Sequence, residues 1–243
     1  MSVAERVQAS VRAANAAARE PVTAGAFTLY RHSASDHPFL NYAVPDAGAT
    51  EWTGIDALRD AFATHGLRPR LEFVAESAPG LEAALTGAGF ELEGRFPVMT
   101  LPAQDLREVP GPAGVVFARA REPADVRALL EVAAEAFGGD PPTDAEVATY
   151  HGRGLLARAD GAPAGAASRT NVAAGVCELA GIGVRERFRR RGIAAALTAA
   201  TAAEAFADGA ELCFLTPGDD GAERVYARAG FARTGTTMVH MVG

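Results

Sequence analysis

The chain has 243 residues, 49% of them hydrophobic and 22% charged, a globular composition that excludes a disordered chain, a collagen or a mucin-like stalk. Its 23 basic and 30 acidic residues give a net charge of −7. An acidic chain is a poor general nucleic-acid binder, although it can carry a local basic site.

The first residues carry a helical stripe of small and branched side chains. Its members are Val3, Val7, Val11, Ala14 and Ala18. This spacing predicts a helix over residues 3–19 that docks on the rest of the protein, in preference to a transit peptide. No secretory signal is visible, and no apolar run approaches the ~18–20 residues that a membrane span needs. We therefore expect a cytoplasmic protein with no membrane partner.

A proline-rich stretch divides the chain. Residues 102–113 hold three prolines and a glycine, a composition typical of a linker. It separates a first domain at 1–101 from a second at 114–243.

The second half alternates helical and strand-like patterns. In chain order we expect a strand at 114–119, a helix at 122–137, a weaker helix from 142 to about 151, strands at 155–158, 164–168 and 176–184, a helix at 192–207, a strand at 212–215, a helix at 220–229 and a last strand at 236–242. Strands and helices in this order predict an α/β fold.

Residues 71–101 repeat residues 212–242 when they are shifted by 141 positions. Nine of the 31 pairs are identical without a gap, including the Ala-Gly-Phe step that begins at Ala88 and recurs at Ala229. Self-similarity at a fixed spacing indicates repeated structural units. We therefore expect two related lobes that share a strand–helix–strand unit.

A turn with five Arg in seven residues, 185–191, joins the long strand to the helix that starts at Gly192. N–H groups at a helix start carry partial positive charge, and glycine lets phosphate oxygens approach them. Arginine adds forked, charged donors. The pattern predicts a diphosphate site, with a solvated basic turn as the plain alternative. A nucleic-acid patch is disfavoured by the acidic net charge and the scarcity of aromatic side chains.

The turn and the helix after it form the motif Arg189-x-x-Gly192-x-Ala194. It resembles the Gln/Arg-x-x-Gly-x-Gly/Ala signature of the GCN5-related N-acetyltransferases, the GNAT superfamily. The segment from Tyr226 to Phe231 resembles the Tyr-x-x-x-Gly-Phe motif of the same family. The order of elements is also similar over the whole second half and, weakly, over part of the first.

The resemblance implies the GNAT fold, an α/β fold with a mixed central sheet flanked by helices, in two related lobes. The lobe at 1–101 has Leu85 where the second lobe has Tyr226, and no Arg-rich turn enters a helix there. We therefore expect 1–101 to be a degenerate copy and 114–243 to be the catalytic domain.

The resemblance also implies acetyl-coenzyme A as the co-substrate. The implied cofactor-binding residues are Ile182, Gly183, Val184, Arg189, Arg190, Arg191, Gly192, Ile193 and Ala194. Backbone N–H groups of the turn would hold the pyrophosphate, and residues 182–184 would pair along the pantetheine arm. A strand-edge N–H would polarise the thioester carbonyl, and strands 176–184 and 211–216 would splay apart to admit the cofactor. Another acyl donor is not excluded.

Acetyl transfer to an amine needs a proton donor for the leaving thiolate and a base or a water chain for the amine. The resemblance places Tyr226 at the general acid of the family; the alternative is a helix residue that packs on the sheet. Glu178, a carboxylate among apolar strand residues, is the candidate base, and its offset resembles that of the catalytic Glu in the histone acetyltransferase branch. It could instead bind the amine, order a water, or pair structurally with Arg169 or another Arg.

Neither metal nor disulfide chemistry is expected. The five His residues (32, 37, 65, 151 and 240) have no short ligand spacing, and neither Cys has a His nearby. Cys177 and Cys213 cannot form a disulfide framework, so buried free thiols are expected. His151, between a helix and a strand, is either an acceptor-pocket residue or an exposed loop residue.

The sequence thus predicts an N-acetyltransferase whose acceptor, a small-molecule or peptide amine, attacks the thioester directly. The alternative is a non-catalytic acyl-CoA-binding sensor or assembly module. No nucleic-acid partner is expected. The identity of the acceptor and the oligomeric state, a homodimer included, are left open.

Overall fold

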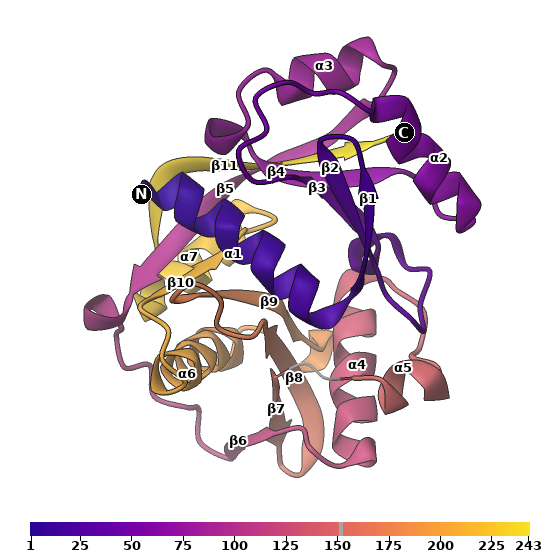
Figure 1. The fold of residues 1–243 in the computed structure, drawn as a ribbon. Helices are drawn as coiled ribbons and strands as arrows, with labels where there is room; N and C mark the ends of the chain where they lie inside the picture. The colour runs from indigo at the N-terminus through magenta and orange to yellow at the C-terminus, as the bar shows by residue number, and fades with distance from the viewer. Residues whose placement is uncertain (151–152) are drawn as a thin grey trace. The chain divides into compact units, whose positions relative to one another are not determined.

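The computed structural model describes residues 1–150 and 153–243. The chain forms two compact units, drawn as a ribbon in Figure 1. Unit 1 comprises residues 1–98 and 233–243, and unit 2 comprises residues 99–232. His151 lies outside the described residues, so neither role considered for it is tested.

Unit 2 contains the helices and strands that the second half of the sequence predicts, except the last strand, which is β11 (Ala232–Val242) and belongs to unit 1. They are β6 (Val115–Arg119), α4 (Pro123–Phe137), α5 (Asp144–Ala148), β7 (Arg153–Ala159), β8 (Ala162–Arg169), β9 (Val176–Val184), α6 (Ile193–Ala207), β10 (Leu212–Leu215) and α7 (Asp220–Ala229). The weak helix predicted from 142 is the short α5, which a capping box of Thr143 and Glu146 starts. The expected α/β fold is confirmed.

The strands of unit 2 form a mixed sheet in the order β5-β10-β9-β8-β7-β6, where β5 is Glu91–Pro102. From β6 to β9 each strand is antiparallel to the next, whereas β9 and β10 are parallel. Helices cover both faces of this sheet (Figure 1). Leu155 packs with side chains of α6 and its neighbour Leu156 with side chains of α4, because successive strand residues point to opposite faces.

A glycine lets α4 lie close to β9. A Cβ on Gly183 would be 2.5 Å from the Cβ of Ala136 in α4, well inside the separation that two carbon atoms tolerate. Residue 183 therefore must have no side chain if α4 is to keep its distance from β9. The close approach fixes the strand on which the predicted site lies.

Unit 1 is also built from helices on a mixed sheet. Its elements are α1 (Val3–Ala18), β1 (Glu20–Ala24), β2 (Phe27–Arg31), β3 (Tyr42–Pro45), α2 (Ile55–Thr64), β4 (Arg70–Val74), α3 (Leu81–Gly87), the first part of β5, and β11 (Ala232–Val242). The strand order is β1-β2-β3-β4-β11-β5. The predicted N-terminal helix is present; it buries Val7, Val11 and Ala14 and contacts β4.

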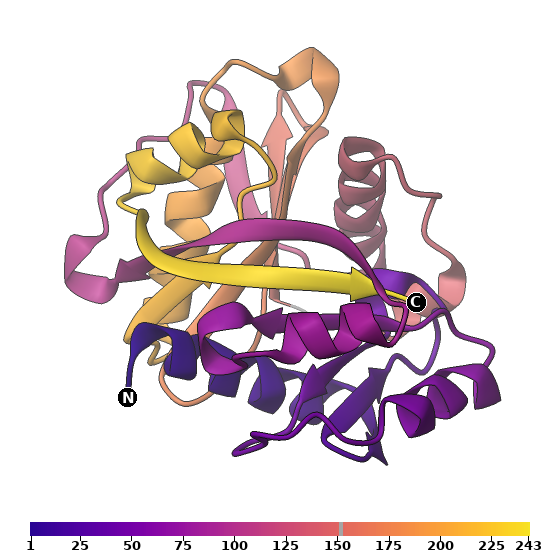
Figure 2. The same ribbon diagram turned by 90° about the horizontal axis from the view of Figure 1, so that it is seen from above.

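The repeated segments exchange their last strands. The repeat comprises β4–α3–β5 in its first copy and β10–α7–β11 in its second. However, β4 pairs with β11 and β10 pairs with β5, both antiparallel. Figure 2 shows β5 and β11 running side by side. Each unit is therefore completed by a strand from the other copy, and the chain passes between units after Val98 and again after Ala232.

The proline-rich stretch 102–113 is tied to unit 2 by backbone hydrogen bonds. The Ala103 N–H donates to the Glu211 carbonyl at 3.1 Å, and the Arg107 N–H donates to the Ala229 carbonyl at 3.0 Å. These bonds hold the stretch against the start of β10 and the end of α7.

Substitution of Gly183 tests the packing of α4 on β9. We expect Gly183→Ala to lower the free energy of unfolding by about 1–3 kcal/mol, because the added methyl group forces the helix and the strand apart. Gly218→Ala is the matched control, since a Cβ there meets no atom within 4 Å. Denaturant unfolding measures both, and equal effects of the two substitutions would contradict the packing argument.

Candidate functional site

The predicted site begins at the edge of β9 that faces β10. The two strands are parallel, but their pairing ends at Glu178 and Phe214. Among the described residues, 179–184 of β9 have no partner strand on this edge. The backbone N–H and C=O groups that this segment directs away from β8, apart from the Val184 carbonyl that accepts from Arg189, can therefore bind an extended ligand as an added strand does.

A glycine bulge lies in this unpaired part of β9. Ala166 pairs with Gly183 and Ser168 with Ala180, so β9 advances by three residues where β8 advances by two. Gly181 has a left-handed backbone, with φ +62°, which glycine adopts without strain. A bulge re-aims the backbone groups around it. The sequence analysis missed this feature, although a glycine inside a strand pattern is a signal for it.

The turn after β9 presents N–H groups at the start of α6. Gly192 is the N-cap, with φ +84° and no side-chain cap. Arg190 also has a positive φ, +62°, which is uncommon outside glycine and is found preferentially at functional sites. Left-handed residues that alternate with others aim successive N–H groups at one point, and the helix dipole adds positive potential there. This arrangement can bind an anion.

Two arginines of the turn hold it in place. Arg185 makes a two-pronged ion pair with Glu135 of α4, through Nε at 2.8 Å and Nη2 at 2.7 Å. The Nε of Arg189 donates to the carbonyl of Val184 at 3.0 Å, which closes the turn on the end of β9. The five arginines are therefore not equivalent: these two side chains position the backbone that would contact an anion.

Two further arginines, Arg187 and Arg191, lie against the ring of Phe188, at 4.8 and 5.8 Å from its centroid. Such cation–π contacts restrict the side chains but leave the charges intact. Beside the turn lies a hollow of about 650 Å³, lined by Arg185, Glu186, Arg187 and Glu135. The charged turn thus borders an open space.

The predicted cofactor-binding residues differ in the direction and burial of their side chains. Ile182 and Val184 point toward α6, whereas Gly183 faces α4. Ile193 is buried, and Ala194 is half-buried. Val184 and Ile193 have buried side chains, so only their backbone groups could contact a ligand.

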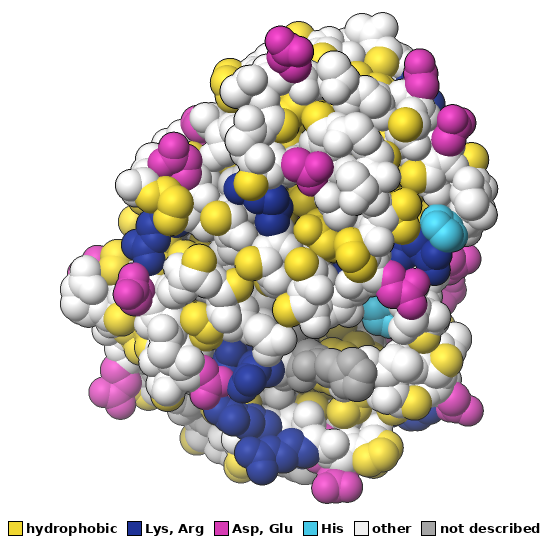
Figure 3. Space-filling view, in the orientation of Figure 1, with side chains coloured by type: hydrophobic (Ala, Val, Ile, Leu, Met, Phe, Trp, Pro, Cys, Tyr) yellow, Lys and Arg dark blue, Asp and Glu magenta, His cyan; other side chains and the backbone are white. Residues whose placement is uncertain are grey.

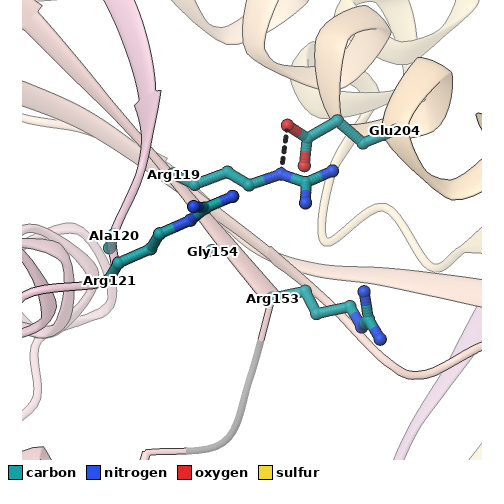
Figure 4. A pocket seen from close by; sticks show the side chains of 6 residues that line it. All are labelled: Arg119, Ala120, Arg121, Arg153, Gly154 and Glu204. Atoms are coloured by element: carbon teal, nitrogen blue, oxygen red, sulfur yellow. Dashed lines mark hydrogen bonds and ion pairs between the residues drawn. The ribbon is translucent and has the colours of Figure 1, made fainter. Parts of the chain in front are cut away.

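A smaller hollow on unit 2 is basic, and two of its arginines take part in ion pairs. Figure 3 shows basic side chains gathered over the region of β6 and β7. Arg119, Arg121, Arg153 and Glu204 line a hollow of about 160 Å³ there (Figure 4). Arg119 donates to Glu204 at 2.7 Å, and Arg153 pairs with Asp208 at 2.6 Å. The anion site is better placed at the start of α6, where the donors are backbone groups.

Tyr226 lies on α7 and packs on the α6 side of the sheet. It belongs to the same apolar cluster as Ile182, and its ring meets that of Phe231 edge-on at 6.5 Å. Burial, followed by the negative charge of Asp219, raises the pKa of the Tyr226 hydroxyl. The hydroxyl is therefore protonated at neutral pH and can act as a hydrogen-bond donor.

Glu178 lies on the other face of β9. Its neighbours Cys177 and Leu179 pack toward α6, so Glu178 points to the α4 side. Arg169, one of its suggested structural partners, is buried and pairs with Asp208. Arg169 is the cross-strand partner of Leu179, whose side chain packs toward α6.

The two cysteines are buried free thiols, as predicted. Cys177 and Cys213 face each other across β9 and β10, just before the pairing ends. In the residues that the structure describes, no group of three or more His, Cys, Asp or Glu side chains could hold a metal ion. Within the same residues, no helix is long and apolar enough to cross a membrane.

Comparison with known proteins points to one family. The acetyltransferase (GNAT) family matches residues 124–231. A GCN5-related N-acetyltransferase from Kribbella flavida is similar over 100% of this chain and 96% of its own, with 31% identity and a TM-score of 0.84. A comparison with curated proteins finds no match.

More distant structures share the fold. A GCN5-related N-acetyltransferase from Sphaerobacter thermophilus is 20% identical, with a TM-score of 0.64 over 90% of this chain and 76% of its own. A tandem GNAT protein from the clavulanic acid biosynthesis pathway is 18% identical, with a TM-score of 0.58 over 90% of this chain and 78% of its own.

The charge of Asp219 gives a test of the environment of Tyr226. We expect Asp219→Asn to lower the pKa of Tyr226, because removal of the negative charge makes the phenolate easier to form. Asparagine can still cap α7, since the Asp219 side chain acts there as an acceptor. Near-ultraviolet titration, with Tyr226→Phe subtracted, measures the pKa. Asp220→Asn should leave it unchanged, and equal shifts in both variants would contradict the assignment.

Proposed function

Because the chain belongs to the GCN5-related N-acetyltransferase (GNAT) family and is an acyltransferase, we propose that it transfers an acetyl group from acetyl-coenzyme A to an amine by direct attack. The observation that carries this proposal is the continuity of three features. The unpaired edge of β9, the Gly181 bulge and the N–H cradle before α6 follow one another along the chain.

The backbone suits the parts of the co-substrate in turn. The N–H groups at the start of α6 would bind the pyrophosphate, which is the role predicted for residues 189–194. Gly192 has no Cβ that would obstruct the pyrophosphate oxygens. The edge formed by 182–184 would pair with the amide groups of the pantetheine arm. At the bulge, a re-aimed N–H would donate to the thioester oxygen and stabilise the charge that develops there.

Tyr226 acts at the sulfur. The amine nitrogen forms a bond to the carbonyl carbon, the carbon–sulfur bond breaks, and the thiolate leaves with the electron pair. A thiol has a pKa of about 8.5 and a tyrosine about 10, so complete proton transfer from tyrosine to the thiolate is uphill by about 2 kcal/mol. Tyr226 therefore stabilises the thiolate chiefly by donating a hydrogen bond, and solvent completes the protonation.

Glu178 acts at the amine. It lies on the face of β9 opposite to the cluster that holds Tyr226. The groups that handle the two protons are thus on opposite sides of one strand, and a thioester held at its edge would lie between them. Glu178 takes the proton that the nitrogen loses on attack, directly or through a water.

Unit 1 carries a related but closed helix start. Gly54 caps α2 with φ +84° and no side-chain cap, as Gly192 does for α6. However, a Cβ on Gly54 would lie 2.6 Å from the Cα of Gly25, and the Ala26 N–H donates to the Thr53 carbonyl at 3.0 Å. The β1–β2 turn therefore occupies the space where an anion would bind. This supports the proposal that residues 1–101 form a degenerate lobe without a cofactor.

We also propose a cytoplasmic location for the enzyme. Two neighbouring buried free thiols support it, because a reducing compartment keeps such thiols from pairing.

The proposal is tested by acetyl-coenzyme A binding and thiol release on a panel of amines. We expect Tyr226→Phe and Glu178→Gln each to lower kcat by about 10²-fold or more, because the first removes the hydrogen bond to the leaving thiolate and the second removes the group that takes the amine proton. The dissociation constant for acetyl-coenzyme A should be the same in both variants as in the wild type. Calorimetry measures binding, and a thiol reagent measures turnover.

Two outcomes would contradict this assignment. Tight binding without thiol release on any amine would favour a non-catalytic acyl-CoA sensor. Full activity of Tyr226→Phe would reduce Tyr226 to a residue that packs on the sheet. Asp220→Asn, an exposed change on the same helix, controls for general damage to α7.

The closed helix start in unit 1 predicts one acetyl-coenzyme A per chain. Calorimetric titration should give a stoichiometry of one, and Gly192→Val should abolish binding, because a β-branched residue is strained at positive φ and fills the cradle. Circular dichroism checks that this variant is folded. A stoichiometry of two, or residual binding in folded Gly192→Val, would overturn the assignment of the single cradle.

A further inference from the structure

One face of β9 is open beside the bulge. Cys177, Leu179 and Ile182 fill the α6 side of the strand with apolar packing. On the α4 side, Ala180 is exposed although it lies inside a central strand. An acceptor can therefore reach the bulge over Ala180, on the side toward which Glu178 points.

Two hydroxyl groups border this opening. Ser168 on β8 is the cross-strand partner of Ala180, and its Oγ lies 4.0 Å from the position that a Cβ on Gly181 would occupy. The hydroxyl of Tyr150 lies 3.0 Å from the same Oγ. Tyr150 is held by the apolar cluster under α4, which contains Leu129, Val132, Leu156 and Ala166. The pair is therefore fixed beside the bulge.

The hydrogen-bonding capacity of Ser168 is not exhausted by this contact. A serine hydroxyl has one proton and two lone pairs. If Tyr150 donates to Ser168, as the more acidic hydroxyl of the two, one lone pair on the Oγ remains. That lone pair can accept an N–H group. Within the opening, the hydroxyl of Ser168 and the carboxylate of Glu178 are thus two acceptors for one incoming nitrogen.

Resting on the proposed function, we infer that Ser168 binds the acceptor amine and that Tyr150 is its positioning residue. A neutral primary amine has two N–H groups and one lone pair. Ser168 accepts one N–H and Glu178 the other, so the lone pair is aimed at the thioester carbon. The proton released on attack passes to Glu178. This arrangement selects primary amines, because a secondary amine can satisfy only one of the two acceptors.

Selectivity between a primary amine and its N-methyl analogue tests the inference. We expect Ser168→Ala to raise the KM for the primary amine and to lower the preference for it about tenfold, equivalent to about 1.4 kcal/mol. Ser168→Thr, which keeps the hydroxyl, should restore the preference. Tyr150→Phe should lower it in the same direction but less. Acetyl-coenzyme A should bind equally well to all of these variants.

The controls separate this inference from the proposed function. Ser33→Ala removes an exposed hydroxyl in unit 1 and should change nothing. An unchanged preference in Ser168→Ala, with an active wild type, would overturn the inference and leave the acetyltransferase assignment intact. No thiol release by the wild type on any amine would overturn both. Should Ser168→Ala fail to fold, the preference ratio of Tyr150→Phe decides the question.

Discussion

The early end of the pairing between β9 and β10 is the constraint on which the rest of unit 2 depends. Strand β9 is paired along one edge with β8 but keeps a free edge after Glu178. A half-paired strand in the middle of a sheet needs support from both faces, and α4 and α6 provide it. Gly183 lets α4 approach closely, and the ion pair of Arg185 with Glu135 ties the turn to the same helix. Contacts on both faces of the strand therefore hold this edge in place.

Local patterns predicted most of the elements and part of the site. Hydrophobic spacing and the Gly192 turn predicted the strand and the helix start, because these features are encoded by neighbouring residues. The anion site at that helix start is part of the proposed function. The strand exchange was not predictable in this way. The alternation of apolar and polar residues indicates a strand but does not say which other strand it pairs with. The different roles of the arginines in the turn were also not predictable from local patterns. They depend on partners such as Glu135, which lies fifty residues from Arg185 in the chain.

The two units show how one backbone plan supports different outcomes. Both start a helix with a left-handed glycine after a strand that is parallel to the next one in the sheet. In unit 1 the hairpin turn at Gly25 fills the space before Gly54, and Glu, Trp and Thr stand where unit 2 has three arginines. Small changes in a turn, rather than loss of the fold, separate an open helix start from a closed one.

The exchange of last strands also has a consequence for biosynthesis. Residues 233–243 are synthesised after all of unit 2, yet they belong to unit 1, whose other residues are made first. Until β11 arrives, β4 keeps an unpaired edge, which is a template for aggregation. Although domains generally fold in the order of synthesis, unit 1 of this chain is completed only after the whole of unit 2 has been made.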